Sequence, residues 1–136
     1  MRPKQSSAEI LRKYPDIKGF QTSAGNDVLG VGRAIEEAGL AGKVCLVGTG
    51  LPAPSAPYLE SGAITAIGFW DPMKAGMAMN AAAQKLLAGE EIVDGMDLGV
   101  DGYHSITVTK GAGDGLLAIG NGMVLADKDT YKDVYF

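Results

Sequence analysis

Cysteine and histidine are almost absent from this sequence, which contains one of each, Cys45 and His104. A single cysteine excludes an internal disulfide bond, and the two residues cannot assemble a structural zinc site, so we predict neither a metal nor another cofactor. Cys45 stands within an apolar run, residues 44–47, and we expect a buried, unreactive thiol. His104 has no obvious acidic partner, so we expect a surface or structural histidine and not a general base.

The sequence also lacks an excess of positive charge and any long apolar run. Its formal net charge is -4, and an acidic chain repels phosphate backbones, which argues against nucleic acid as a partner. No stretch approaches the roughly 20 apolar residues that cross a bilayer. Residues 1–7 carry no apolar segment of the secretory-signal type. A chain made in this form is therefore expected to stay in the cytoplasm.

The residues that are present favour a folded domain of alternating strands and helices. The 136 residues are 46% hydrophobic, which is enough for a buried core. A short helix is expected to open with a capping box, Ser6 to Glu9, and to end before Pro15. Strands are expected at residues 17–22, 43–48 and 63–69. The helices after them are expected to start at Asn26 or Asp27, at Ser55 and at Asp71, and to end at Gly39, Gly62 and Gly89.

Strands that alternate with helices predict an α/β fold with a parallel sheet, here a three-layer Rossmann-like lobe. The apolar run at residues 43–48 is typical of a strand buried on both faces of such a sheet. The first helix has no strand before it, and few parallel strands follow, which indicates an incomplete lobe. An exposed sheet edge invites pairing with another chain, so we expect self-association into a homo-oligomer.

The character of the sequence changes after residue 89. Residues 1–89 have the pattern of strand–helix units, whereas residues 90–136 form an irregular segment with short strands at 105–109, 116–119 and 123–125. The Gly-Asn-Gly sequence at 120–122 predicts a tight turn between the last two of these strands. We treat residues 1–136 as a single partial ligand-binding lobe. On the helix before residue 89, Met77 and Met79 are expected to fill the core.

Three loops at the predicted carboxyl ends of the strands carry the candidate binding residues. In open α/β sheets, ligands bind at this edge, where helix N-termini point at the ligand. The first loop offers Ser23, Ala24, Gly25 and Asn26, the second offers Thr49 and Gly50, and the third offers Trp70 and Asp71.

Several of these residues have a structural alternative to ligand binding. The Asn26 amide both donates and accepts, which suits a hydroxyl pair on a polyol, but it suits a helix N-cap equally well. The Trp70 ring suits stacking on the C–H face of a sugar-like ligand, or ordinary core packing. Asp71 suits a helix cap or a ligand acceptor. Thr49 and Gly50 are expected to present backbone N–H groups to the ligand.

Signatures of catalysis are weak or absent. Residues 48–50 form a G-x-G after a strand, but Ala53 replaces the third glycine of the dinucleotide fingerprint. The glycines at 25–32 are not followed by the Lys-Ser/Thr pair of a P-loop, and neither Ser55 nor Ser61 lies in a nucleophile elbow. No nucleophile and base can be paired from the sequence, so we predict a binding protein and not an enzyme.

In order and spacing, several short motifs resemble the C-terminal lobe of type I periplasmic binding proteins, and more narrowly the branch that binds rhamnose or autoinducer-2. The motifs are residues 14–19, 25–27, 47–50, 68–72 and 120–125, with the tail to Tyr135 and Phe136. They cover nearly all of the chain. Relatives of the ribose type often carry a ligand-binding aspartate after the second strand, where this chain has Thr49 and Gly50.

The resemblance implies the solute-binding component of an ABC importer for a sugar or sugar-like ligand, located in the periplasm. Two lobes would close around the ligand and then present themselves to a membrane permease. This chain would supply one wall of the cleft and lack the N-terminal lobe. The same resemblance implies that positions 23–26 line the cleft and that Trp70 falls at a cleft position. The alternatives are the effector-binding lobe of a LacI-type transcription regulator and a small Rossmann-like enzyme.

Overall fold

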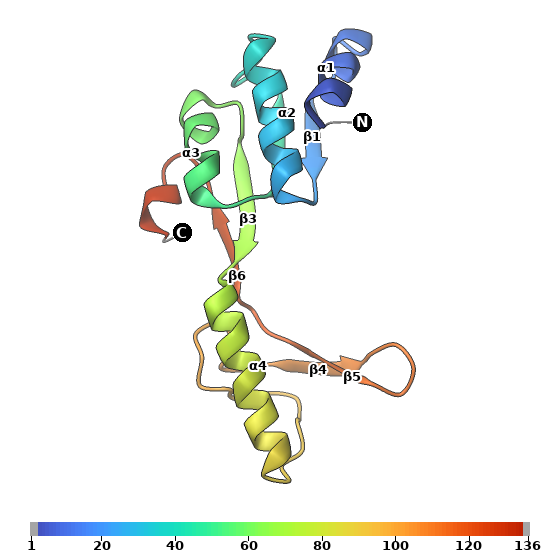
Figure 1. The fold of residues 1–136 in the computed structure, drawn as a ribbon, viewed down its shortest axis with the longest axis vertical. Coiled ribbons are helices and arrows are strands. Elements are labelled where there is room, and N and C mark those ends of the chain that lie inside the picture. The colour runs from blue at the N-terminus through green and yellow to red at the C-terminus, as the bar shows by residue number, and fades with distance from the viewer. Residues whose placement is uncertain (1–2, 135–136) are drawn as a thin grey trace. The chain divides into compact units, whose positions relative to one another are not determined.

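The computed structural model describes residues 3–134 and divides the chain into two compact units (Figure 1). The first unit runs to Phe69 and resumes at Leu125, and the second comprises Trp70–Val124. The end of the tail motif, Tyr135 and Phe136, lies outside the described residues. In chain order the elements are α1 (Pro3–Lys13), β1 (Gly19–Thr22), α2 (Gly25–Glu37), β2 (Cys45–Thr49), α3 (Pro52–Ser61), β3 (Ala66–Trp70), α4 (Pro72–Leu87), β4 (Thr107–Lys110), β5 (Leu116–Ile119), β6 (Met123–Ala126) and the 3-10 helix η1 (Tyr131–Asp133).

A sheet with three parallel strands, β1, β2 and β3, organises the first unit and confirms the predicted α/β class. Its strand order is β1-β2-β3-β6, with β1 and β6 at the edges. β1 pairs in parallel with β2, where Phe20 is opposite Leu46, and β2 pairs in parallel with β3, where Gly48 is opposite Ile67. The strands expected at 17–22, 43–48 and 63–69 are therefore all present, although each starts slightly later than expected.

The core of the first unit lies between this sheet and helices α2 and α3. Because the order of β1, β2 and β3 follows the chain, right-handed crossovers place both helices on the same face of the sheet. α1 packs beside α2 (Figure 1). Each large apolar side chain buried here stabilises the fold by about 1.5–3 kcal/mol. The buried side chains include Leu46, Ile67 and Phe69 from the strands and Val28, Val31, Ile35 and Leu59 from the helices.

The opposite face of the central strand β2 is exposed, and two expectations are wrong as a result. Cys45 and Val47 alternate with the buried Leu46, and both are exposed to solvent. The strand is therefore not buried on both faces, and the thiol of Cys45 is not hidden. The physical reason is that α2 and α3 lie on one side of the sheet, and within residues 3–134 the other side of β2 is left uncovered.

Two helices begin at a proline and not at the expected side-chain cap. α1 begins at Pro3, so the predicted capping box at Ser6 falls inside it. α3 begins at Pro52, and Ser55, its predicted cap, lies inside the helix and is fully buried. Proline has a fixed φ suited to the first helical position and lacks the N–H that a cap would satisfy. A proline start therefore removes part of the need for a capping side chain.

The start of α2 also differs from the prediction, whereas the helix ends agree with it. The N-cap of α2 is Ala24, and Asn26 and Asp27 lie in the first turn. The expected C-terminal glycines follow α2, α3 and α4. They adopt the left-handed conformation that a helix end favours and that glycine tolerates. Their φ angles are 67° at Gly39, 78° at Gly62 and 81° at Gly89.

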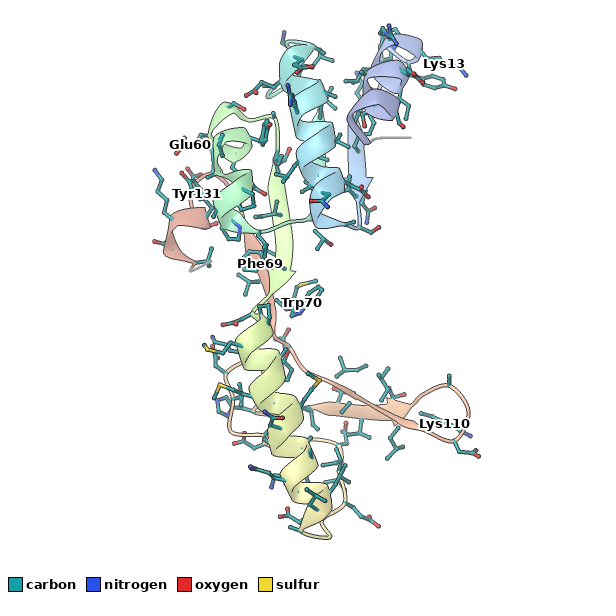
Figure 2. All side chains as sticks on the ribbon, viewed as in Figure 1. Lys13, Glu60, Phe69, Trp70, Lys110 and Tyr131 are labelled. Atoms are coloured by element: carbon teal, nitrogen blue, oxygen red, sulfur yellow. The ribbon has the colours of Figure 1, made fainter. Side chains whose placement is uncertain are left out.

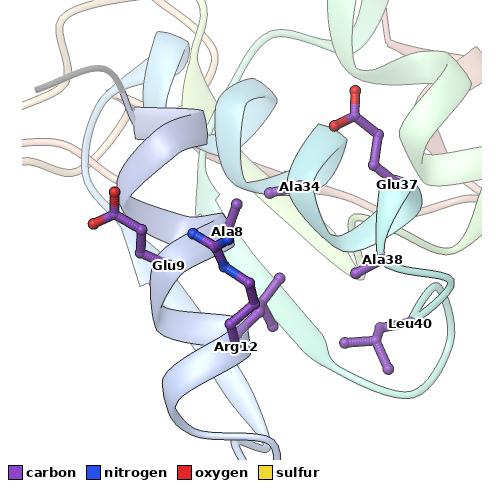
Figure 3. A pocket seen from close by; sticks show the side chains of 8 residues that line it. Ala8, Glu9, Arg12, Ala34, Glu37, Ala38 and Leu40 are labelled. Atoms are coloured by element: carbon purple, nitrogen blue, oxygen red, sulfur yellow. The ribbon is translucent and has the colours of Figure 1, made fainter.

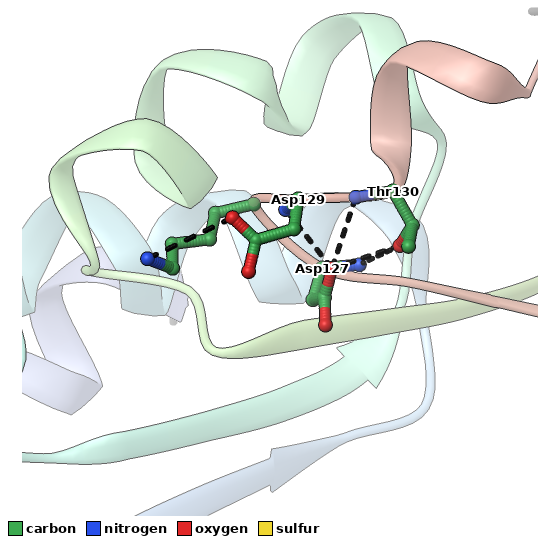
Figure 4. A network of polar contacts seen from close by, with 4 residues as sticks. Asp127, Asp129 and Thr130 are labelled. Carbon is green, nitrogen blue, oxygen red and sulfur yellow. Dashed lines mark hydrogen bonds and ion pairs between the residues drawn. The ribbon is translucent and has the colours of Figure 1, made fainter.

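A hydrogen-bonded turn joins β6 to η1 (Figure 4). Oδ1 of Asp127 accepts from the backbone N–H groups of Asp129 and Thr130 at 3.0 Å and from the Thr130 hydroxyl at 2.8 Å. The Thr130 hydroxyl and the Asp129 N–H hold the pKa of Asp127 below its ordinary value. η1 is in turn tied to α3, because the Tyr131 hydroxyl donates to the Glu60 carboxylate (Figure 2), a bond that raises the pKa of Tyr131.

The second unit has its own small core. Ala78 of α4 packs with Leu98, Val100 and Ile106, and β4 and β5 form an antiparallel pair next in the chain. Because α4 is held by the residues that follow it, the boundary between the units falls after Phe69, earlier than the change of sequence character at residue 89.

The buried side of α4 is its small-residue side. Ala78 is buried and Ala81 and Ala82 are partly buried, whereas Met77 and Met79 are exposed. The expectation that these two methionines fill the core is therefore wrong. The spacing of apolar residues along α4 does not tell which face of the helix is buried, the one with the alanines or the one with the methionines. Residues 92–108 pack closely against the alanines, so that face is the buried one.

The glycines at 120 and 122 do not form the expected hairpin turn. In the described sheets β5 pairs with β4, while β6 joins the sheet that contains β3. A Cβ atom at Gly120 would lie 2.2 Å from the Tyr103 ring, and one at Gly122 would lie 2.8 Å from the Tyr103 hydroxyl. The two glycines therefore allow the backbone to pass against the Tyr103 ring, a close approach that a side chain would prevent.

We expect Cys45 to react with a maleimide reagent in the folded chain. The thiol is exposed on the uncovered side of β2, so labelling without denaturant should be complete and nearly as fast as labelling of the unfolded chain. Mass spectrometry measures the mass added over time, and a Cys45→Ser variant gives the background. Labelling that begins only when the chain unfolds would contradict the exposed position.

Candidate functional site

The carboxyl ends of β1 and β2 bring the first two predicted loops together. These strands are parallel and in register, so Thr22 at the end of β1 is opposite Gly48. Ser23 and Thr49 follow these two residues in the sequence and therefore lie at the same edge of the sheet. The structure thus places the loop of Ser23, Ala24, Gly25 and Asn26 next to the loop of Thr49 and Gly50.

The first loop ends at an uncapped helix. Ala24 is the N-cap of α2, its backbone is extended, and no side chain caps the helix. The N–H groups of Asp27 and Val28 donate to the Ala24 carbonyl at 3.0 and 3.3 Å. The first N–H groups of a helix have no intrahelical acceptor, so those of Gly25 and Asn26 point out of α2. Asn26 is exposed and not engaged as a cap, which leaves its amide accessible to a ligand.

Gly50 of the second loop is fixed by packing. Its N–H donates to the Gly68 carbonyl at 3.2 Å, so the expectation that this N–H serves a ligand is wrong. A Cβ atom at Gly50 would lie 3.0 Å from side-chain atoms of both Ile67 and Val28. Glycine is thus required for the close approach of the loop to the core. Thr49 is partly exposed just before it.

Prolines reduce the number of free backbone N–H donors in the first turn of α3. Leu51 is its N-cap and makes no side-chain cap bond, but Pro52 and Pro54 have no backbone N–H. Of the first three helical positions only Ala53 carries a donor. This helix end is therefore a poor site for an anion, which needs several converging N–H groups.

The third loop begins the second unit and has its own geometry. Oδ1 of Asp71 accepts from the N–H groups of Met73 and Lys74 at 2.8 and 3.3 Å, and Pro72 at the first helical position has no N–H. Asp71 is therefore the N-cap of α4, which is one of the two roles predicted for it. Trp70 is 51% exposed, which excludes core packing and leaves a ring face open to solvent.

Sequence reasoning missed two hydroxyl groups close to these loops. Thr22 Oγ1 and Ser55 Oγ are buried and have no hydrogen-bonding partner among the described residues. Thr22 ends β1, and Ser55 Oγ lies below Gly50, 3.2 Å from where its Cβ would be. A serine three residues after a proline gave no sign of burial, because the same pattern suits a helix cap.

The partner of His104 was also missed. In the second unit, His104 Nδ1 lies 2.9 Å from Asp97 Oδ1, and both side chains are largely exposed. The Gly99 N–H, which donates to the same oxygen at 2.6 Å, and then His104 keep the pKa of Asp97 below its ordinary value. Such a pair across a folded loop has no fixed sequence spacing. Its exposure is that of a surface ion pair and fits the expected surface histidine.

A separate groove of about 580 Å³ runs between α1 and α2 (Figure 3). Its lining includes Ala8 and Leu11 of α1 and Ala34 and Ala38 near the C-terminal end of α2. Because the predicted loops meet the opposite end of α2, none of the candidate binding residues lines this groove.

The described residues offer no metal site and no membrane span. Within residues 3–134, no three His, Cys, Asp or Glu side chains are placed to hold a metal ion. No helix in that range is long and apolar enough to cross a bilayer.

Comparison with known proteins identifies a family and a fold. The sequence pattern of the periplasmic binding protein domain matches residues 2–91, more than half of the chain. Among solved structures, LsrB from Clostridium saccharobutylicum in complex with AI-2 is 19% identical with a TM-score of 0.77, covering 98% of this chain and 44% of that one.

Two further structures show the same likeness. A sugar ABC transporter protein from Actinomyces odontolyticus is 20% identical with a TM-score of 0.79, covering 98% of this chain and 42% of that one. An ABC transporter solute-binding protein from Clostridium phytofermentas with bound L-rhamnose is 20% identical with a TM-score of 0.73, covering 96% of this chain and 44% of that one. The chain thus spans less than half the length of each structure.

We expect Asp71 to act through the stability of α4. Asp71→Ala should lower the free energy of unfolding by about 1 kcal/mol, because the N–H groups of Met73 and Lys74 lose their acceptor. Asp71→Asn, which keeps an oxygen at the same place, should lose much less. Chemical denaturation measures both, and amide exchange at residues 73 and 74 locates the effect. Equal stability of Asp71→Ala and the unsubstituted chain would contradict the cap.

Proposed function

This chain belongs to the periplasmic binding protein domain family, and we propose that it forms one ligand-binding lobe of the solute-binding component of an ABC importer for a sugar or sugar-like ligand. The proposed role is binding without catalysis, which is supported by the match to the periplasmic binding protein domain and by the hydrogen-bonding groups that the loop residues offer. The rest of the cleft would come from a second lobe, which agrees with the share of the related structures that this chain covers.

The uncapped N-terminus of α2 is the observation that carries this proposal. It offers the backbone N–H groups of Gly25 and Asn26 beside the exposed side chains of Ser23 and Asn26. Hydroxyl and amide groups both donate and accept, as a polyol requires. Thr49 extends the set from the neighbouring strand. Ala24 and the Gly50 backbone shape the surface between these polar groups.

The helix ends favour a neutral ligand over an anion. The first turn of α3 has lost donors to Pro52 and Pro54, and Asp71 occupies those of α4. Asp27 adds a negative charge to the first turn of α2. A phosphate or carboxylate would therefore meet few donors and some repulsion, whereas a neutral sugar uses the same hydroxyl and amide groups without that cost.

Trp70 would provide the apolar part of recognition. Its exposed ring has a flat face of the kind that packs on sugar C–H groups, and Asp71 would place a second carboxylate oxygen near the same end of α4. We propose that these two residues contact the ligand in the assembled cleft.

Within the family, we propose the branch that binds rhamnose or autoinducer-2. The order of the motifs supports this branch, and Thr49 and Gly50 stand where ribose-type relatives often have an aspartate. Two of the related structures hold AI-2 and L-rhamnose. The complete protein would work in the periplasm, where its closed form would meet the importer's permease.

L-rhamnose should bind this chain weakly and at the predicted loops. One lobe makes only part of the contacts and cannot close around the sugar, so we expect a dissociation constant of about 1 mM or weaker. A titration followed by amide chemical shifts should move the signals of residues 23–26 and 49. Asn26→Ala should weaken binding roughly two- to tenfold, the worth of one hydrogen bond.

Asn80→Ala is the matched control for that substitution. Asn80 is an exposed asparagine on α4, away from the predicted loops in the sequence, so its loss should leave the affinity unchanged. Unshifted signals at residues 23–26 and 49 with saturating L-rhamnose, other monosaccharides and AI-2 would count against the proposed function.

We also propose that the chain self-associates through β1. β1 is an edge strand of the sheet, and its outer backbone groups have no strand to pair with in the described order. Sedimentation velocity should show the average mass rising with protein concentration. Lys placed at an exposed edge position, Gln21→Lys, should reduce the association. A single monomeric boundary at all concentrations would rule this contact out.

A further inference from the structure

Strand β5 of the second unit has an open hydrogen-bonding edge. In the described sheets β5 pairs only with β4 (Figure 1), and a sheet of two strands is only marginally stable by itself. All four residues of β5 are exposed, and Leu116 is 70% exposed. The sheet therefore has room for a further strand on the side of β5 that faces away from β4.

The pairing of β4 with β5 shows which backbone groups lie on this edge. The Val108 N–H donates to the Asp94 carboxylate at 2.9 Å, so the backbone groups of Val108 face away from β5. Ala118 is opposite Val108, and in an antiparallel pair both members of such a residue pair turn their N–H and C=O groups outward. The direction alternates along a strand, so Leu116 shares it with Ala118. The free edge of β5 therefore presents the N–H and C=O groups of Leu116 and Ala118.

No charged side chain protects this edge. Residues 115–126 contain no Asp, Glu, Lys or Arg, whereas exposed edge strands usually carry a charge or a proline that prevents pairing. The outer edge of β4 differs, because Lys110 ends the strand and the Asp94 carboxylate occupies the outward N–H of Val108. The edge of β5 is thus the side of the hairpin that can accept another strand.

An apolar groove of about 660 Å³ lies between α4 and one face of the hairpin. Leu116 and Ala118 line it from β5, and Leu86 lines it from α4. Its lining also includes Glu90 and Glu91, whose carboxylates disfavour an acidic strand beside them. An added strand with uncharged, apolar side chains would extend this wall of the groove.

We propose that the free edge of β5 pairs antiparallel with β5 of a second copy of this chain, about a two-fold axis at Leu117. In this register the outward groups of Leu116 and Ala118 in one copy bond to those of Ala118 and Leu116 in the other, which forms four backbone hydrogen bonds. The large Leu116 side chain then lies opposite the small Ala118 on the groove face, and the two Leu117 side chains meet on the other face. The strand is therefore complementary to itself.

The contact is small, and the dimer that it forms is transient. A four-residue strand buries far less than the roughly 1,200 Å² of a stable interface. The contact lies in the second unit, so it is distinct from the edge of β1, and it does not depend on sugar binding by the predicted loops. Its test therefore needs a probe at residue 117 itself.

Cysteine cross-linking provides that probe. In a Cys45→Ser chain, Leu117→Cys places two thiols across the two-fold axis, where the Cα atoms are about 4.5 Å apart and a disulfide bond can form. With copper-phenanthroline as the oxidant, the covalent dimer should form at least about tenfold faster than from Leu87→Cys, since pairing raises the effective concentration of the thiols. Leu87 is 89% exposed on α4 and reports random collision. Gln21→Lys at the edge of β1 should leave the rate unchanged. Equal rates at positions 117 and 87 would overturn the proposal.

Edge variants of the Leu117→Cys chain give a second measurement. Ala118→Pro removes one outward N–H and no bond to β4, so it should slow cross-linking to the rate of the Leu87→Cys control. Leu116→Lys adds a charge to the edge of each copy and gives a second loss should Ala118→Pro fold poorly. Circular dichroism and the midpoint of thermal unfolding check the fold of each variant. Unchanged cross-linking in the folded variants would refute the contact.

Discussion

The parallel pairing of β1, β2 and β3 is the constraint on which the rest of the first unit depends. Side chains alternate between the faces of a strand, so this register decides that Leu46 enters the core while Cys45 and Val47 face away. The same register brings the carboxyl ends of β1 and β2 to one edge. The loops that follow are thus positioned by backbone hydrogen bonds, which leaves their side chains available for recognition.

Helices α2, α3 and α4 each follow a strand, and their N-termini differ in how the backbone N–H groups are satisfied. α2 begins without a side-chain cap, α3 begins with prolines, and α4 begins with an aspartate that occupies its donors. Backbone donors are therefore concentrated at one helix end. This uneven distribution, more than any single residue, supports the proposal of a hydroxyl-rich, uncharged ligand.

The elements that depend on local pattern were predictable, and those that depend on packing partners were not. The strands and the glycines at the helix ends follow from spacing and backbone preference, and so does the grouping of the first two loops. The exposure of Cys45 was not predictable, since an apolar run does not reveal how many faces of a sheet are covered. The burial of Ser55 and of the Thr22 hydroxyl depends on how the helices pack on the sheet, which single positions in the sequence do not encode.

The prolines of α3 affect the conformational freedom of the neighbouring loop, and with it the entropy of ligand binding. Pro52, Pro54 and Pro57 restrict the backbone of the unfolded chain, so the conformational entropy of this segment is already low before folding. In the folded chain the fixed φ of Pro52 also limits the conformations open to the loop after β2, and such preorganisation reduces the entropic cost of association. The loop at residues 23–26 contains no proline. The loop at residues 23–26 would therefore change conformation to fit ligands of different shape, whereas the loop after β2 would keep its conformation.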